Sequence, residues 1–337
     1  MPIEADCSGN RAVRVKVDES TDPRYGTEPY RRSIKDYVNF GFIILDKPRG
    51  PTSSEVVSWV KKLLNIGKAG HSGTLDPGVS GVLPIALGES TKVLQGIANA
   101  EKEYVGVMLL HSQVDQDRVR AVFKEFTGRI YQRPPLRSAV KRRIRVKTVY
   151  DLDILEFDGR YVLFRARVES GTYIRKLCYD IGEVLGVGAS MRELRRVRVG
   201  CFREEDAVNL ETLREAYALW RDYGDEALLR RVIRPVEEMV IHLPRIYVRD
   251  SAVDAIAHGA SLAAPGVAKV EEGIVKNQLV ALMTLKGELI ALAEATASTE
   301  EILSMNRGIV AKPTRVIMPR GVYPSTWRRS QQKPESK

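Results

Sequence analysis

The segment from His71 to Pro84 constrains this chain more than any other, because glycines and prolines surround a single carboxylate, Asp76. Glycine allows positive φ angles and proline fixes φ near one value, so the segment predicts a shaped loop. The apolar run 82–87 that follows predicts a buried strand. A carboxylate fixed between rigid turn residues and a core strand suits a nucleophile or a base. Asp-Pro-Gly is also an ordinary turn sequence, in which the Asp side chain bonds its own backbone.

Composition bounds the class of protein. With 337 residues the chain exceeds the usual size of one domain, so two domains are expected. Its 53 Lys and Arg residues outnumber its 43 Asp and Glu residues, and this excess favours a polyanionic partner such as RNA. Three widely spaced cysteines, Cys7, Cys178 and Cys201, predict a reducing compartment and no disulfide framework.

Other classes of protein are disfavoured. The four histidines show no pairing typical of a zinc site, so no metal is expected. No apolar run has the length of a transmembrane helix, and the first residues do not resemble a signal peptide. The protein is therefore expected to be soluble and cytoplasmic.

Local patterns predict the main elements. Strands are predicted by apolar or alternating runs at residues 40–45, 102–110 and 161–168. Thr52 and Glu55 have the spacing of a capping box, which predicts a helix that stops near Gly67. Apolar residues with helical spacing predict a helix over 174–186 and an amphipathic helical segment over 210–239.

The character of the sequence changes beyond Pro244. Short β-type runs follow, separated by Gly and Pro, with one short helix predicted around residues 253–260. Two runs, at 279–285 and 288–293, flank Lys286-Gly287 and predict a hairpin. This series of short strands predicts a small β-barrel.

Several motifs together resemble one known family. Residues 71–77 followed by 81–84 resemble the catalytic motif of the TruB-type pseudouridine synthases, closest to the archaeal and eukaryotic branch typified by dyskerin, the RNA-guided H/ACA enzyme. Further similar motifs lie at residues 47–48, 102–104, 133–142, 170–177 and 188–200. The segment from 244 to 327 resembles a PUA domain, an RNA-binding module.

The resemblance implies an α+β fold, with a catalytic domain on a mixed, mainly antiparallel sheet flanked by helices, plus a small C-terminal β-barrel. The implied domains are an N-terminal arm at 1–37 that packs on the C-terminal domain, a catalytic domain at 38–240, a PUA domain at 241–327 and a polar tail at 328–337.

The resemblance also implies the site residues. Asp76 is the nucleophile or base, Arg175 pairs with it, and Tyr173 closes the pocket and is a candidate for proton transfer. The implied contacts to the target nucleotide are stacking by Tyr104, packing by Leu194 and base flipping by His71. The implied RNA-binding residues are Lys141, Arg142, Arg143, Arg195 and Arg196. No metal and no cofactor are implied, because the isomerisation oxidises nothing and adds nothing.

Plainer roles also fit these residues. Tyr104 fits half-buried packing on a sheet, and Tyr173 and Arg175 fit surface positions. The basic stretch 133–147 fits an edge strand protected by charge, and the arginines of 192–198 fit a solvated helix face. The chain departs from the family pattern at Gly78, Ser80, Ser190 and Val197. Gly78 replaces a common lysine, which predicts one weaker RNA contact.

The leading hypothesis is the catalytic subunit of an archaeal-type H/ACA ribonucleoprotein that isomerises uridines in ribosomal RNA, with the T-loop uridine of tRNA as a further target. The implied partners are guide RNA, ribosomal RNA, tRNA and two small core proteins bound to the catalytic domain, and no membrane. The alternatives are a stand-alone tRNA pseudouridine synthase and a non-catalytic RNA-binding scaffold of the same fold.

Overall fold

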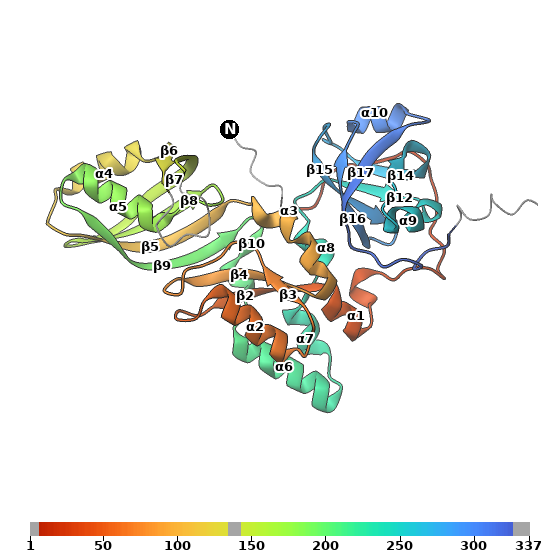
Figure 1. Cartoon of the computed structure of the whole chain (residues 1–337), viewed down its shortest axis with the longest axis horizontal. Coiled ribbons are helices and arrows are strands. Elements are labelled where there is room, and N and C mark those ends of the chain that lie inside the picture. The colour runs from red at the N-terminus through yellow and green to blue at the C-terminus, as the bar shows by residue number, and fades with distance from the viewer. Residues whose placement is uncertain (1–6, 134–142, 326–337) are drawn as a thin grey trace, which may run out of the picture.

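The computed structural model describes residues 7–133 and 143–325 and divides them into two lobes, each built on one sheet (Figure 1). The larger lobe has a 10-stranded sheet and the smaller, C-terminal lobe a 7-stranded one. The predicted α+β class, with a mixed sheet, flanking helices and a smaller C-terminal β unit, is confirmed. No helix among the described residues is long and apolar enough to cross a membrane.

The larger sheet has the strand order β11-β2-β4-β9-β5-β8-β7-β6, with β3 paired to β4 and β10 to β9. Its strands are β2 (Gly41–Lys47), β3 (Ala69–His71), β4 (Ser80–Leu87), β5 (Lys102–Leu110), β6 (Gly128–Gln132), β7 (Arg145–Asp158), β8 (Tyr161–Val168), β9 (Ala189–Val199), β10 (Phe202–Arg203) and β11 (Arg234–Pro235). Among the named strands of this sheet only β4 and β9 pair in parallel, and they do so over two residue pairs.

Helices flank both halves of this sheet. They are α1 (Ile34–Asn39), α2 (Ser53–Leu63), α3 (Leu94–Ala98), α4 (Gln116–Glu125), α5 (Ile174–Leu185), α6 (Leu210–Tyr223), α7 (Ala227–Val232) and α8 (Val236–Met239). Helices α4 and α5 lie beside β5–β9, whereas α2, α6 and α7 lie beside β2 and β4 (Figure 1). Each group covers its own apolar core.

The predicted strands and capped helices are confirmed, with one early helix end. The capping box of α2 is present, because the Glu55 amide donates to the Thr52 hydroxyl over 3.1 Å. Helix α2 ends at Leu63, before Gly67, because Asn65 takes the left-handed conformation with φ 50°. Helix α5 ends as predicted at Gly186, whose φ of 75° closes the last turn.

The segment 210–239 is not one helix. It forms α6, α7, the short strand β11 and α8. Gly224 ends α6 with a φ of 73°, and the backbone turns there before α7 begins. Amphipathic spacing continues through the break, because all three helices turn apolar residues toward the sheet.

The C-terminal lobe contains α9 (Asp250–Ala257), α10 (Thr299–Ser304) and strands from both ends of the chain. Its strands are β1 (Val13–Val15), β12 (Arg245–Val248), β13 (Leu262–Ala263), β14 (Val267–Glu271), β15 (Leu279–Thr284), β16 (Leu289–Ala295) and β17 (Ile309–Val316). The predicted hairpin is the β15–β16 pair. Strand β1 pairs with β14, so residues from the N-terminal arm complete the C-terminal sheet.

The two lobes share an apolar cluster. Phe42 and Val82 of the larger sheet pack in it with Met283 and Leu292 of the C-terminal lobe, and all four are almost fully buried. The buried Glu237 adds polar contacts, since it accepts hydrogen bonds from Arg32 of the arm (2.7 Å) and from the amide of Leu289 (2.9 Å). Burial of this kind fixes one lobe against the other.

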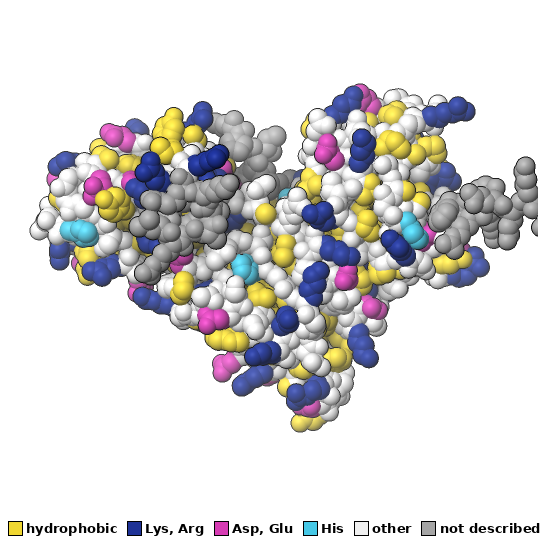
Figure 2. All heavy atoms as spheres, viewed as in Figure 1, with side chains coloured by type: hydrophobic (Ala, Val, Ile, Leu, Met, Phe, Trp, Pro, Cys, Tyr) yellow, Lys and Arg dark blue, Asp and Glu magenta, His cyan; other side chains and the backbone are white. Residues whose placement is uncertain are grey.

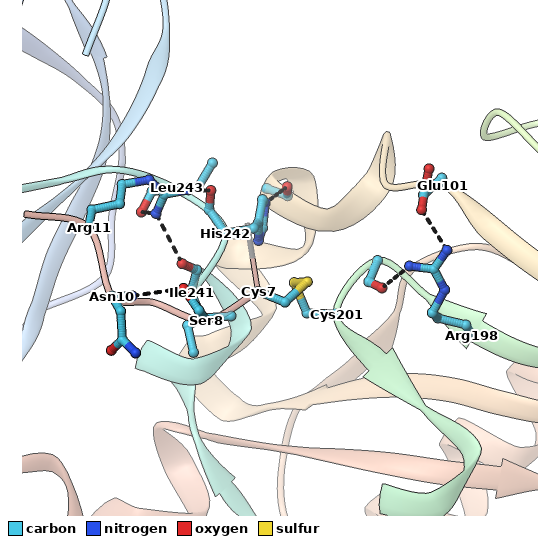
Figure 3. Close-up of a disulfide and its surroundings, with 12 residues drawn as sticks. Cys7, Ser8, Asn10, Arg11, Glu101, Arg198, Cys201, Ile241, His242 and Leu243 are labelled. Carbon is cyan, nitrogen blue, oxygen red and sulfur yellow. Dashed lines mark hydrogen bonds and ion pairs between the residues drawn. A yellow bond between two sulfur atoms is a disulfide. The ribbon is translucent and has the colours of Figure 1, made fainter. Parts of the chain in front are cut away.

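A disulfide corrects the expectation drawn from the cysteines. Cys7 of the arm is bonded to Cys201, which lies in the turn between β9 and β10 (Figure 3). Near it, the Arg11 guanidinium donates to the carbonyl of His242 over 2.9 Å. The partners are 194 residues apart in sequence, so spacing gave no sign of the pair. The bond removes the ground for inferring a reducing compartment, while Cys178 is a buried free thiol.

Replacing Cys7 by serine is expected to lower the free energy of unfolding by about 2–4 kcal/mol, because the unfolded chain regains the freedom that the cross-link removes. Denaturant unfolding of wild type and Cys7→Ser, with and without a reductant, measures this difference. The two proteins should differ without the reductant and coincide with it. Equal stability without the reductant would contradict a disulfide between Cys7 and Cys201.

Candidate active site

The loop between β3 and β4, which carries Asp76, is held by hydrogen bonds to two buried side chains. The fully buried Lys47 ammonium donates to the carbonyl of Val79 over 2.8 Å. The Ser53 hydroxyl, at the start of α2, accepts from the amide of Leu75 over 2.9 Å. These contacts hold the backbone on both sides of Asp76. The Asp76 side chain therefore projects from a backbone segment whose position is fixed.

Asp76 is half-exposed and forms an ion pair with Arg175, which is equally exposed. The Arg175 Nη2 group donates to the Asp76 Oδ2 atom. A backbone turn is present as well, because the Val79 amide donates to the Asp76 carbonyl over 3.0 Å. The Asp76 carboxylate therefore takes no part in the turn. Among the described residues, no hydrogen bond reaches its Oδ1 atom.

The start of α5 is held by Gln132, a residue that the motif analysis missed. The nearly buried Gln132 amide clasps the backbone of Tyr173, accepting from its N–H (3.0 Å) and donating to its carbonyl (3.1 Å). Tyr173 immediately precedes α5, and Arg175 is in its first turn. Gln132 therefore fixes the point from which both side chains project. Its position at the end of β6 gave no signal in the sequence.

Tyr104 and Leu194 lie on neighbouring strands and face the same apolar core as the loop residue Leu75. Gly106 on β5 is the register partner of Leu194, and a Cβ there would come within 2.8 Å of Leu194. Both Tyr104 and Leu194 are mostly buried. We call the adjacent side chains of Tyr104 and Leu194 the platform. The structure thus brings together the loop of Asp76, this platform and the start of α5.

His71 lies at the end of β3, and its Nδ1 atom is buried with no hydrogen-bond partner among the described residues. Burial, and after it the positive charge of Arg196, lower the pKa of His71. A neutral ring is thereby favoured, since the charged form is poorly solvated there.

The predicted RNA-binding residues have different surroundings. Lys141 and Arg142 lie outside the described residues, and Arg143 is exposed. Arg195 is partly exposed but already pairs with Asp46 (2.9 Å) and Glu204 (2.7 Å). The prediction for Arg196 is wrong, because this side chain is 1% exposed and lies where an RNA backbone cannot reach it. The arginines of β9 alternate between the two faces of a strand, and the charge count alone could not reveal this.

Four protein-family models match the chain, and together they span most of it. The TruB family pseudouridylate synthase N-terminal domain matches residues 61–174, and the tRNA pseudouridylate synthase B C-terminal domain matches residues 175–241. The PUA domain matches residues 244–317, and the DKCLD domain matches residues 3–57.

Similar proteins match over nearly their whole length. A probable tRNA pseudouridine synthase B of Pyrobaculum aerophilum is 56% identical over 95% of this chain and 96% of its own. The counterpart of Methanocaldococcus jannaschii is 52% identical over 94% of each chain. A protein in the structure of an H/ACA ribonucleoprotein bound to a substrate RNA containing 2′-deoxyuridine is 48% identical, with a TM-score of 0.88 over 95% of this chain and 99% of that one. The protein of a Cbf5-Nop10-Gar1 complex is 51% identical, also with a TM-score of 0.88, over 95% and 98% of the two chains.

The family models identify an RNA pseudouridine synthase that carries a PUA domain. The chain belongs to the TruB family of pseudouridylate synthases, of the dyskerin-like branch. Its reaction is the isomerisation of uridine to pseudouridine.

Replacing Gln132 by alanine tests the anchoring of α5. The change removes the Gln132 acceptor of the Tyr173 N–H and one of two donors to the Tyr173 carbonyl, which still accepts from the Leu177 amide over 2.9 Å. The free energy of unfolding should therefore fall by about 1–3 kcal/mol. Pseudouridine formation should fall as well, because Tyr173 and Arg175 lose their fixed position. Gln116→Ala, at an exposed position of α4, is the control and should change neither. Full activity of Gln132→Ala would show that the two hydrogen bonds between Gln132 and the Tyr173 backbone do not position the site.

Proposed function

We propose that this chain is the catalytic subunit of an H/ACA ribonucleoprotein, in which a guide RNA selects the uridine to be isomerised in ribosomal RNA. The supporting observation is its similarity to the protein of an H/ACA ribonucleoprotein over 95% of this chain and 99% of that one. The similarity therefore includes the C-terminal lobe as well as the catalytic lobe. The proposed partners are guide RNA, its target RNA and small proteins of the kinds named Nop10 and Gar1 in the similar complex.

Asp76 is the proposed nucleophile or base. The reaction breaks the bond between N1 of uracil and the ribose, turns the base within the site and rejoins it through C5. The free Oδ1 atom of Asp76 is available for this step, while Arg175 holds Oδ2. A charge-assisted hydrogen bond of this kind orients the carboxylate.

The other site residues are proposed to hold the base. Tyr104 supplies an aromatic face for stacking, and Leu194 packs beside it, since a base pulled from its own stack loses contacts that a protein must replace. Tyr173 closes the pocket and is a candidate for proton transfer at C5. His71, with its neutral ring, assists entry of the flipped nucleotide.

RNA is proposed to bind across both lobes. Lys and Arg side chains lie along the face that runs from the C-terminal lobe to the tip formed by α6 (Figure 2). Arg143 is exposed next to the start of β7, and Arg195 would have to exchange a carboxylate partner for a phosphate. We propose the domain division 38–240 and 241–327, with the arm 1–37 packed on the second domain. The proposed location is cytoplasmic, which a disulfide does not oppose because intracellular proteins of hyperthermophilic archaea contain them.

A second candidate function is modification of tRNA without a guide. The observation that favours it is the name of the similar Pyrobaculum and Methanocaldococcus proteins, probable tRNA pseudouridine synthase B. Both functions use the same site and differ only in what presents the uridine.

Asp76→Asn should abolish isomerisation and leave RNA binding nearly unchanged, because the amide keeps the shape of the side chain but cannot act as nucleophile or base. The measurement is tritium release from [5-³H]uridine-labelled RNA, together with RNA affinity at a fixed salt concentration. Asp153→Asn, another half-exposed aspartate paired with an arginine, is the matched control and should retain activity. Equal loss of binding and turnover in Asp76→Asn would mean that Asp76 is structural.

The same assay separates the candidate functions. Release that requires a guide RNA and the small partner proteins supports the ribonucleoprotein subunit. Release from a tRNA transcript alone, with no response to a guide, supports the stand-alone enzyme. Binding without release from any RNA would support a scaffold and contradict both.

Arg175→Gln should lower turnover and leave the free energy of unfolding nearly unchanged. The pair with Asp76 is half-exposed, so the free energy of unfolding should change by less than about 1 kcal/mol. Turnover should fall by roughly 100-fold, because the carboxylate loses the group that orients it. Arg165→Gln is the matched control, since Arg165 forms a 3.1 Å pair with Asp153 at the same exposure. Unchanged turnover in Arg175→Gln would contradict the proposed role.

A further inference from the structure

Lys102, the first residue of β5, is 4% exposed, although a lysine is rarely this deeply buried. An ammonium group has three N–H donors. The Nζ atom of Lys102 donates to the carbonyls of Ala98 (3.0 Å) and Ala100 (2.6 Å) and to the hydroxyl of Ser170 (2.8 Å). The Ser170 hydroxyl donates in turn to the Ala98 carbonyl over 2.7 Å. Lys102 therefore joins the end of α3 to Ser170 and uses all its donors to do so.

Ser170 lies in the short connection 169–173 between β8 and α5. The connection ends at Tyr173, and Arg175 follows in the first turn of α5. The Ser170 carbonyl accepts from the Lys147 ammonium over 2.6 Å, so the backbone of Ser170 is held as well as its side chain. Because Ser170 is so close to Tyr173 along the chain, a displacement of Ser170 also displaces the start of α5.

Helix α3, at the other end of the link, belongs to the junction between the lobes (Figure 1). Ile97 of α3 is almost fully buried in the apolar cluster that contains Leu292 of the C-terminal lobe. The Gly96 carbonyl accepts from the Nε2 atom of His242 over 3.0 Å. Lys102 therefore connects the active-site segment to a helix whose position is fixed by both lobes.

The charge of Lys102 is not neutralised by a carboxylate, because each of its acceptors is an uncharged oxygen. Burial, and after it the charges of Arg196 and Lys147, lower the pKa of Lys102 to about 7. Arg198, a nearly buried cation on β9, instead pairs with Glu101 over 2.7 Å (Figure 3). A buried charge without such a partner is costly, and an uncharged side chain of similar length would avoid that cost. The surroundings of Lys102 therefore point to a role that requires its hydrogen bonds.

We propose that Lys102 is a positioning residue that fixes Ser170, and with it the start of α5, relative to α3. Tyr173 and Arg175 project from that start, so the link determines where both side chains lie. Gln132 holds the backbone of Tyr173 directly, and Lys102 holds the segment that precedes it. The effect on turnover rests on the proposed function, in which Arg175 orients the catalytic carboxylate, whereas the contacts of Lys102 do not.

The first test detects the position of Tyr173 without turnover. The probe is 3-fluorotyrosine, incorporated at position 173, and the measurement is its fluorine resonance at one fixed pH. Lys102→Met keeps the length of the side chain and removes the donors, and Ser170→Ala removes the hydroxyl that Lys102 holds. Each change should shift the resonance, because the segment before Tyr173 loses an anchor. Gln132→Ala, which frees the Tyr173 backbone, is the positive control.

Lys16→Met is the matched control. The Lys16 ammonium also donates to two carbonyls at the end of a helix, those of Ile302 and Met305, but it does so in the C-terminal lobe. This variant should leave the resonance in place, and thermal unfolding shows which variants are folded. An unchanged resonance in folded Lys102→Met overturns the proposal, whatever the protein does to RNA. Should Lys102→Met not fold, an unchanged resonance in folded Ser170→Ala overturns it.

The second test measures the effect on the reaction, with single-turnover rates and RNA affinity determined in the complete complex. Lys102→Met and Ser170→Ala should each lower the rate by roughly 10- to 100-fold with little change in affinity, because a small misplacement of a reacting group has effects of that size. The double variant should be no slower than the slower single one, since both changes break the same link. Lys16→Met should retain the wild-type rate.

The outcomes distinguish this inference from the proposed function. Multiplied losses in the double variant, or an equal loss in Lys16→Met, overturn the positioning role and leave Lys102 as a part of the core. Should the wild type release no tritium from any RNA, the proposed function fails, and the fluorine resonance still decides whether Lys102 positions the start of α5.

Discussion

The active site depends on the short parallel pairing of β4 with β9. Only Ser80–Arg195 and Gly81–Arg196 are paired, and this contact joins the half of the sheet that carries the catalytic loop to the half that carries the platform. The approach is close enough to exclude any other residue at Gly81, where a Cβ would lie 2.2 Å from the Arg196 carbonyl and φ is +105°. Asp76 comes from one half and Arg175 from the other, so their ion pair spans this junction.

Exposed and buried charges have different tasks in this site. Asp76 and Arg175 are half-exposed, which suits their proposed contact with a substrate. Lys47, Lys102 and Arg196 are buried and donate mainly to carbonyls or hydroxyls, so they organise the backbone around the site. Buried donors of this kind hold their acceptors firmly, because breaking the hydrogen bond would leave a charge in a medium of low dielectric constant.

A segment of the N-terminal arm is part of the C-terminal lobe, and this matters for how RNA could be held. Strand β1 extends the sheet, and the arm returns to the catalytic lobe through Cys7 and Cys201. A common apolar cluster lies between the lobes. An RNA bound to the PUA domain would therefore keep a fixed distance from Asp76, which a guided reaction requires.

The sequence by itself determined the local elements and the chemistry. Strands β5 and β8 and helix α5, with its cap at Gly186, follow from apolar spacing and caps, because these signals lie within one segment of the chain. The motif around Asp76 and its resemblance to a family predicted the reaction and proposed residues for it. Only the tertiary structure decided the Cys7–Cys201 bond, the break at Gly224 and the burial of Arg196. Each depends on segments far apart in sequence or on which face of a strand meets the core. A count of arginines along β9 cannot separate Arg195, which reaches solvent, from its neighbour, which lies under the catalytic loop.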